Sequence, residues 1–298
     1  MNTPSTERFW LTIPVLMAPS SHLTNGGRIS VLGKIADLVS GIRAPRAGLN
    51  LASSYVLKFA PMAESEARSL YLDLCGRASH LAYRVGVAFV IPRQQLSVAS
   101  DAGFDHSAPK LIPENLQPQF AAGMLVPTRH TEPNSLFREL STYAAINDER
   151  VLAALDLWHV TYHETTPRAQ FLTYITILES LSLQQSRSNE TIEWIDRILL
   201  DAEKFNDASL VGALHGLKKV SIRATIEGLI FRSAKQQGKS DAETNSLLKC
   251  FKKLYETRSK LTHSGTAEVI DTAAALEIVR IVLDAAIAAP EVVFSKKP

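Results

Sequence analysis

The 298-residue sequence contains only two cysteines, Cys75 and Cys250. They lie far apart and in no metal-ligand spacing, so the sequence indicates neither a disulfide framework nor a zinc ribbon. The N-terminus lacks the basic stretch and apolar core of a secretory signal, and no uninterrupted apolar run is long enough to span a bilayer. We therefore expect a cytoplasmic protein that makes no membrane contact.

Net charge is also low. The 32 lysines and arginines are balanced by 30 aspartates and glutamates, which gives a formal charge of +2. This balance excludes a strongly basic nucleic-acid coat protein but leaves room for a local basic site. Hydrophobic residues make up 46% of the chain and charged residues 21%, a composition typical of globular domains.

The first 134 residues contain no phosphate-binding glycine loop, no nucleophile elbow and no metal-ligand cluster. We expect no cofactor and no metal site. Apolar periodicity predicts a mixed α/β domain over residues 1–134. Its predicted strands cover 9–17, 28–32, 55–60, 85–91 and 120–126, with a turn at Asn25-Gly26-Gly27, a short helix over 35–42, a helix opening at Pro61 and a loop over 100–118.

Turn-forming residues collect between Pro127 and Pro133, and helical periodicity follows them. The sequence therefore predicts an α+β protein whose second domain, residues 135–298, is an antiparallel helical bundle. The predicted helices cover 135–146, 148–164, 168–184, 190–203, 208–233, 241–263 and 268–288.

The helix predicted over 241–263 carries an unusual group of polar residues. Arg258 falls on its apolar face, where a guanidinium needs a carboxylate, a phosphate or water as a partner. His263 follows just before Ser264-Gly265, a typical helix end. Ser259 and Thr262 add two hydroxyls. The alternative is an inactive helix end. A positively charged imidazole there is stabilised by the helix dipole and has no catalytic role.

Two further features accompany this helix. Glu179 lies at the edge of an apolar stripe, where a carboxylate needs a cation, and Arg258 is a suitable partner. That pair alone is also consistent with a purely structural salt bridge. A run of basic residues with one acid among them, Glu256, forms either a phosphate-binding surface or an ordinary solvated one. The basic residues are Lys249, Lys252, Lys253, Arg258 and Lys260.

This pattern resembles the HEPN superfamily, in which an arginine and a histidine separated by four to six residues end a bundle helix. The segment from Tyr255 to Gly265 is most similar to the Apea-like branch. Upstream, residues 171–181 end in Leu178-Glu179-Ser180-Leu181, similar to the first core helix of that branch. The resemblance covers roughly residues 136–290.

The resemblance implies an endoribonuclease whose catalytic pair is Arg258 and His263. Glu179, Ser259 and Thr262 are then supporting residues. From the charge of the basic run, we expect Lys252, Lys253 and Lys260 to bind the RNA. Such enzymes need no metal, because the 2′-hydroxyl of RNA is the nucleophile and the product is a 2′,3′-cyclic phosphate.

The family also implies biological partners. It suggests RNA, including tRNA, as substrate, a homodimer with a composite cleft, and a role as a toxin or anti-phage effector. An antitoxin or a trigger would then act at the N-terminal domain. The competing interpretation is a non-catalytic HEPN module that dimerises or binds a nucleotide.

Overall fold

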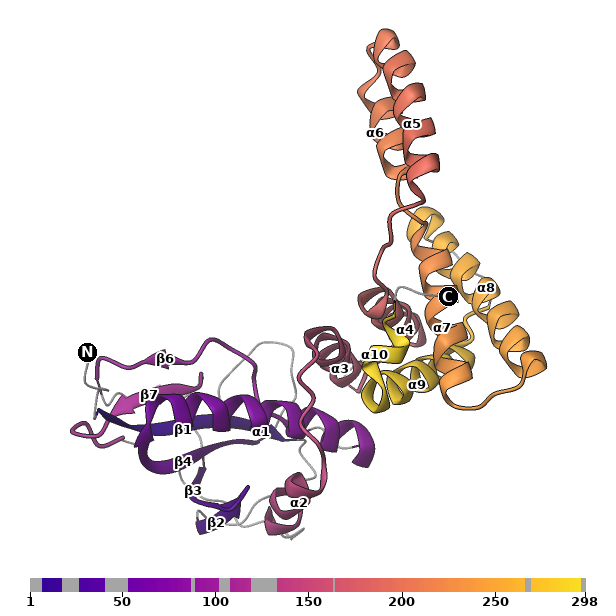
Figure 1. The fold of residues 1–298 in the computed structure, drawn as a ribbon. Helices are drawn as coiled ribbons and strands as arrows, with labels where there is room; N and C mark the ends of the chain where they lie inside the picture. The colour runs from indigo at the N-terminus through magenta and orange to yellow at the C-terminus, as the bar shows by residue number, and fades with distance from the viewer. Residues whose placement is uncertain are drawn as a thin grey trace. The chain divides into compact units, whose positions relative to one another are not determined.

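The computed structural model describes residues 7–17, 27–40, 53–86, 89–101, 108–118, 133–162, 164–265 and 269–295. The fold is α+β, as predicted, with a sheet region followed by helices (Figure 1). The chain divides into two compact units, unit 1 over Met1–Asn147 and unit 2 over Asp148–Pro298. No helix within the described ranges is long and apolar enough to cross a membrane.

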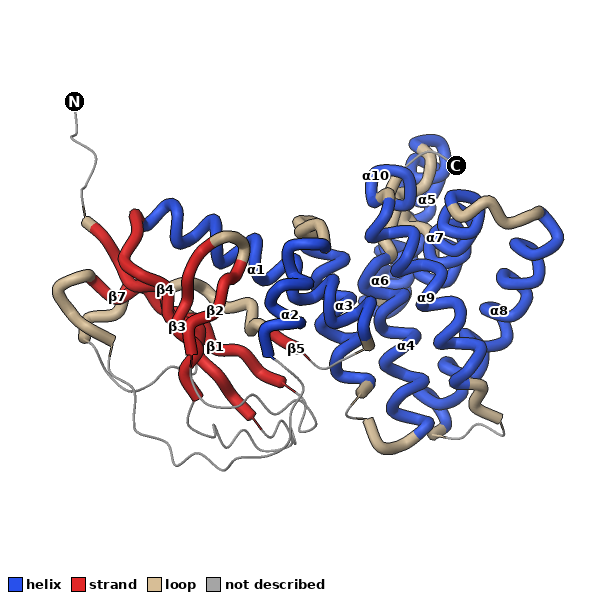
Figure 2. Tube along the Cα trace, turned by 90° about the horizontal axis from the view of Figure 1, so that it is seen from below, coloured by secondary structure: helices blue, strands red, loops and turns tan. Residues whose placement is uncertain are grey.

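Unit 1 is built on a sheet that has seven strands among the described residues (Figure 2). Six follow the order β2-β3-β4-β1-β7-β6, and β5 pairs with β1. In this described sheet only the β6–β7 pairing is parallel. The strands are β1 Arg8–Met17, β2 Gly27–Val31, β3 Lys34–Ser40, β4 Ser53–Ala63, β5 Phe89–Val90, β6 Ser97–Val98 and β7 Lys110–Pro113.

Helix α1, Glu64–Val85, packs on this sheet through an apolar stripe at helical spacing. Its buried residues include Ala67, Leu70, Leu74, Ala78 and Leu81. The segment before unit 2 crosses α1 at Gly76, where an added Cβ would lie 2.5 Å from the Ile146 carbonyl oxygen. This close approach requires glycine.

The division between the units falls after Asn147, later than the predicted boundary at residue 134. Helices α2, Pro133–Glu139, and η1, Leu140–Thr142, belong with the sheet. Phe137 and Leu140 are buried in the same apolar cluster as the strands. The helix predicted over 135–146 is therefore shorter than expected, ending with η1 at Thr142, and it belongs to unit 1 and not to the bundle.

The predicted helix over 35–42 is wrong, because residues 35–40 lie in β3, while 41 and 42 lie outside the described residues. Ala36 and Leu38 are buried while Ile35 is exposed, which is the two-residue period of a strand. The β2–β3 hairpin turns at Leu32 and Gly33, both with positive φ, as a tight hairpin turn requires. Leucine at such a position gives no turn signal in the sequence.

Other predicted boundaries in unit 1 also shift. Pro61 lies in β4 and the helix begins at Glu64. In the predicted strand over 85–91, Val85 belongs to α1 and Phe89–Val90 form β5, while 87 and 88 lie outside the described residues. The predicted loop over 100–118 contains β7. The predicted strand over 120–126 and the segment 127–132 lie outside the described residues, as do Asn25 and Gly26.

Unit 2 is helical throughout its described regular structure. The predicted helix over 208–233 is in fact two helices, α6 and α7, because residues 218–220 pair with residues 185–187. Ser221 then caps α7 by accepting from the Ala224 amide. The helices are α3 Glu149–Thr161, α4 Pro167–Leu181, α5 Asn189–Ala202, η2 Glu203–Phe205, α6 Ala208–Leu217, α7 Ile222–Gln236, α8 Asp241–Ser264, α9 Thr272–Ala288 and α10 Pro290–Val293.

The core of unit 2 lies where α4, α7, α8 and α9 pack together. Each contributes fully buried apolar side chains, such as Phe171 of α4, Ile226 of α7, Phe251 of α8 and Val279 of α9. Small residues of α9, among them Ala285 and Ala286, are buried and allow close packing of the helices. This core fixes α8 and therefore the candidate site at its end.

Candidate functional site

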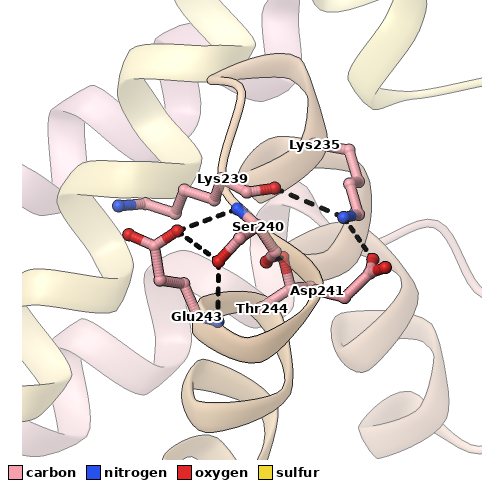
Figure 3. A network of polar contacts seen from close by, with 6 residues as sticks. All are labelled: Lys235, Lys239, Ser240, Asp241, Glu243 and Thr244. Atoms are coloured by element: carbon pink, nitrogen blue, oxygen red, sulfur yellow. Dashed lines mark hydrogen bonds and ion pairs between the residues drawn. The ribbon is translucent and has the colours of Figure 1, made fainter.

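Helix α8 begins at a capping box, which Figure 3 shows together with its neighbours. The Ser240 hydroxyl accepts from the Glu243 amide at 3.3 Å, and the Glu243 carboxylate accepts from the Ser240 amide at 2.8 Å. Lys235 of α7 binds Asp241 at 2.5 Å and also donates to the Lys239 carbonyl. The first turn of α8 is therefore tied to α7.

These contacts predict a pH dependence at the start of α8. The hydrogen bond from the Ser240 side chain holds the pKa of Glu243 below its ordinary value of 4.5. Because the folded pKa is the lower one, this contact stabilises the fold above about pH 4.5 and is lost as pH falls through the folded pKa. Carboxyl NMR titration should show a low pKa for Glu243 that rises in Ser240→Ala. An unchanged pKa in the variant would contradict the assignment.

Arg258, near the end of α8, points to α4 and makes the expected ion pair with Glu179. Its Nη2 lies 3.1 Å from Oε1 and donates to Oε2 at 3.4 Å. The two side chains are only 30% and 21% exposed. This pairing stabilises a guanidinium on the apolar side of α8 and fixes its direction.

The ring of Tyr255 lies beside the guanidinium of Arg258, a contact that the sequence did not indicate. The guanidinium carbon lies 5.8 Å from the centre of the Tyr255 ring, one turn away on the same helix. Burial raises the pKa of the Tyr255 phenol, and the charge of Glu179 raises it further. The sequence feature that could have indicated this contact is the spacing of three residues between Tyr255 and Arg258, which makes them neighbours on a helix.

Thr262 and Ser259, the two hydroxyl residues predicted to support the site, have different surroundings. Thr262 Oγ1 donates to the carbonyl oxygens of Arg258 at 2.6 Å and Ser259 at 3.2 Å, so its proton is bound within α8. The Ser259 side chain is half-buried. The helix ends at Gly265, whose φ of 71° is left-handed and whose carbonyl accepts from Arg168 of α4.

His263 lies in the exposed last turn of α8 and makes no hydrogen bond or ion pair with the described residues. Five helical positions separate it from Arg258, which places the two side chains about 140° apart around the axis. By the same geometry His263 lies within about 20° of Lys252 and 60° of Lys260. The imidazole and the guanidinium therefore leave α8 on different sides.

We call the exposed surface of α8 that includes His263 the basic face. Its lysines lie toward solvent, as expected for solvated or phosphate-binding groups. The single acid among them, Glu256, is bound at 4.0 Å by Arg223 of α7, an ion pair that the sequence did not indicate. The basic face consists of Lys249, Lys252, Lys253, Lys260 and His263.

A pocket of about 520 Å³ in unit 2 lies between the C-terminal end of α4, α7 and α10. Its lining includes Leu181, Leu229, Arg232 and Phe294, and neither residue of the predicted pair. In the part of the chain that the structure describes, no three His, Cys, Asp or Glu side chains gather as metal ligands.

Comparison of the chain with protein-family models, with curated proteins and with solved structures finds no match in any of the three. The resemblance to the HEPN superfamily is therefore a prediction that depends on the residues of α4 and α8 alone.

Proposed function

We propose that this protein is a metal-independent endoribonuclease of the HEPN type. The observation that carries the proposal is the position of His263, which is exposed at the end of α8 on the same side of the helix as the lysines of the basic face. A cationic surface attracts the phosphates of a nucleic acid, and an imidazole titrates near neutral pH. Together they provide a place where a proton can be moved beside a bound phosphodiester.

The proposed reaction uses the 2′-hydroxyl of the RNA itself. His263 accepts the hydroxyl proton as the oxygen attacks the adjacent phosphorus, and a proton returns to the departing 5′-oxygen. The guanidinium of Arg258 stabilises the added charge on the phosphate oxygens. The products are a 2′,3′-cyclic phosphate and a 5′-hydroxyl, and DNA is not cleaved.

The directions of the two side chains favour a composite site. Because Arg258 and His263 lie about 140° apart on one helix, a single α8 does not easily present both to one phosphate. A two-fold homodimer would bring Arg258 of one chain to His263 of the other. Glu179 then positions the guanidinium, and Ser259 and Thr262 support the end of α8.

The same ion pair supports a second candidate function. Arg258 already has a carboxylate partner in its own chain, which satisfies a structural role without any substrate. In this alternative, unit 2 is a non-catalytic HEPN module that dimerises or binds a nucleotide. It predicts binding without bond cleavage.

The biological setting follows from the enzyme proposal. A ribonuclease of this type acts in the cytoplasm as a toxin or an anti-phage effector, with tRNA among its candidate substrates. Unit 1 offers a separate body with its own core, so an antitoxin or an activating trigger would bind there.

The proposal is tested by incubating the full chain with tRNA, total RNA and single-stranded DNA in excess EDTA. We expect cleavage of RNA alone, because only RNA carries the attacking hydroxyl. Cleavage that stops with the chelator contradicts the metal-free mechanism. RNA that is bound but left intact favours the non-catalytic module.

A separate prediction concerns the basic face. Replacing Lys252 and Lys253 with alanine should weaken RNA binding and reduce the slope of log K against log salt by about 0.7 for each phosphate that is no longer neutralised. The matched control is Lys204→Ala, which removes an exposed lysine from η2. Binding measured by fluorescence anisotropy at several salt concentrations gives the slopes. Equal slopes for all variants would show that the basic face does not bind RNA.

A further inference from the structure

The pocket of about 520 Å³ in unit 2 has a single charged residue, Arg232 of α7, among its described lining residues. Its volume lies within the range of about 300–1,000 Å³ that is typical of small-molecule sites. Helices α7 and α10 pack together beside the end of α4 and form its walls (Figure 1). Serines and glutamines of the segment 182–186 supply uncharged polar groups. The apolar part of the lining consists of Leu181, Leu183, Leu229 and Phe294.

Arg232 makes no ion pair with a carboxylate of the described residues. Its Nε donates to the Val293 carbonyl of α10 at 2.8 Å, and its two terminal nitrogens make no hydrogen bond within the described ranges. The side chain is half-buried, and this burial lowers the pKa of its guanidinium. A guanidinium in such a place needs water or an anion as its partner.

The direction of the Arg232 side chain is fixed from two sides. Its Nη1 lies 3.2 Å from the position that a Cβ on Gly228, one turn earlier in α7, would occupy, so the side chain runs back along its own helix. The bond to Val293 holds Nε and ties α10 to α7. This structural role uses one of the five N–H groups, which leaves those of Nη1 and Nη2. Together these two nitrogens form the fork that binds a carboxylate through two parallel hydrogen bonds.

The apolar wall beside Arg232 is also held in place. The ring of Phe294 is covered by Arg150 of α3, whose guanidinium carbon lies 3.8 Å from the ring centre. Arg150 does not add an unbalanced charge, because Asp148 binds it at 2.7 Å. A preformed wall of this kind lowers the entropy cost of binding an apolar group.

Charge decides which class of ligand fits. Helices α4 and α10 meet the pocket at their C-terminal ends, where the helix dipole opposes added negative charge. One carboxylate is balanced by the one guanidinium of Arg232. A phosphate monoester carries about 1.5 to 2 negative charges at neutral pH and would remain partly unbalanced. The pocket therefore favours a monoanion over a phosphate ester, and Arg232 disfavours a cation.

We propose that this pocket binds a small organic acid with one carboxylate and an apolar body. The carboxylate accepts hydrogen bonds from Nη1 and Nη2 of Arg232, and the body packs on Leu229 and Phe294. The described lining includes no residue of α8 and neither member of the predicted catalytic pair, so the proposal does not rest on the ribonuclease proposal.

The test is isothermal titration calorimetry of the purified full chain with phenylacetate, cinnamate and octanoate. We expect at least one of these acids to bind with a dissociation constant below about 1 mM. Its uncharged primary amide should bind at least tenfold more weakly, because the charge-assisted hydrogen bonds are lost. Phenyl phosphate should bind more weakly than the best acid. The proposal is overturned if none of the acids binds, if the amide binds equally well, or if phenyl phosphate binds best.

Replacing Arg232 with glutamine removes the charge and keeps a side-chain N–H for the Val293 carbonyl. Arg232→Gln should weaken binding of the acid at least tenfold and leave binding of the amide unchanged. The matched control is Arg197→Gln, which removes an exposed arginine of α5 that is not part of the lining and should have no effect. Wild-type affinity for the acid in Arg232→Gln contradicts the proposal.

Circular dichroism establishes that the variants are folded. If Arg232→Gln does not fold, Leu183→Asp tests the same site with Arg232 in place. Leu183 is 46% exposed in the lining, and an aspartate there should weaken binding of the acid at least tenfold by repelling it and by competing for the guanidinium. Leu200→Asp makes the same change at a leucine of α5 that is 65% exposed and outside the lining, and should have no effect. Unchanged affinity in a folded Leu183→Asp overturns the proposal.

Discussion

Replacing His263 with alanine is expected to lower the rate of RNA cleavage about 10²–10⁴-fold, the usual contribution of a positioned general acid or base. Within the basic face, His263 supplies the imidazole, the side chain that most often acts as a general acid or base. Because it makes no hydrogen bond or ion pair with the described residues and lies on an exposed turn, its loss should leave the fold intact.

The measurement is single-turnover cleavage of a labelled RNA, which separates chemistry from product release. His215→Ala removes another exposed imidazole, on α6, and should retain the wild-type rate. RNA affinity should change little in His263→Ala, because the lysines of the basic face remain. A variant that keeps most of its activity would exclude His263 from the chemistry.

Replacing Arg258 with alanine is expected to cost about 10²–10³-fold, as for the removal of one group that stabilises transition-state charge. The structure adds a second effect, because Glu179 then lacks its cation at a site only 21% exposed. Arg258→Lys keeps the charge but loses the planar fork, so it should recover only part of the activity. Thermal unfolding of both variants separates lost chemistry from lost stability.

Mixing the inactive Arg258→Ala and His263→Ala proteins under subunit exchange tests where the two groups meet. If each site takes its arginine from one chain and its histidine from the other, a mixed dimer has one complete site of two. Half of the dimers are mixed, so about a quarter of wild-type activity should return. A site built within one chain regains nothing on mixing.

Local sequence patterns were sufficient to predict the extent of α8, but they did not predict where α6 ends. The helix predicted over 241–263, with its end at Ser264-Gly265, covers nearly the whole of α8. Phe251, Leu254 and Leu261 recur at helical spacing along it, and all three are buried. The break between α6 and α7 depends on pairing of 218–220 with 185–187, an interaction between distant segments that no local pattern contains.

The prediction of a helix over 35–42 was wrong for a different reason. Ile35, Leu38, Val39 and Ile42 fit a helical face, but the burial of Ala36 and Leu38 follows the period of a strand. Short apolar runs of this kind are compatible with both periods. Pairing with β2 and β4, which the sequence did not reveal, decides in favour of the strand.

For the candidate site, the sequence predicted the ion pair of Arg258 with Glu179, and the structure confirms it. Helical periodicity also separated Arg258 from His263. It did not indicate that Tyr255 lies beside the guanidinium, that Arg223 binds Glu256 or that Arg168 binds the end of α8. Each of these depends on how side chains are directed, and the last two depend on tertiary packing.

The most direct test of the central claim uses one RNA in two forms, with and without a single 2′-deoxy substitution at the cleaved linkage. Both are incubated with the full chain in EDTA, and the ends of the products are identified by mass spectrometry. The proposed mechanism predicts a 2′,3′-cyclic phosphate and a 5′-hydroxyl from the unmodified RNA, and no cleavage at the deoxy position. Cleavage at that position, or a 5′-phosphate product, would contradict attack by the 2′-hydroxyl.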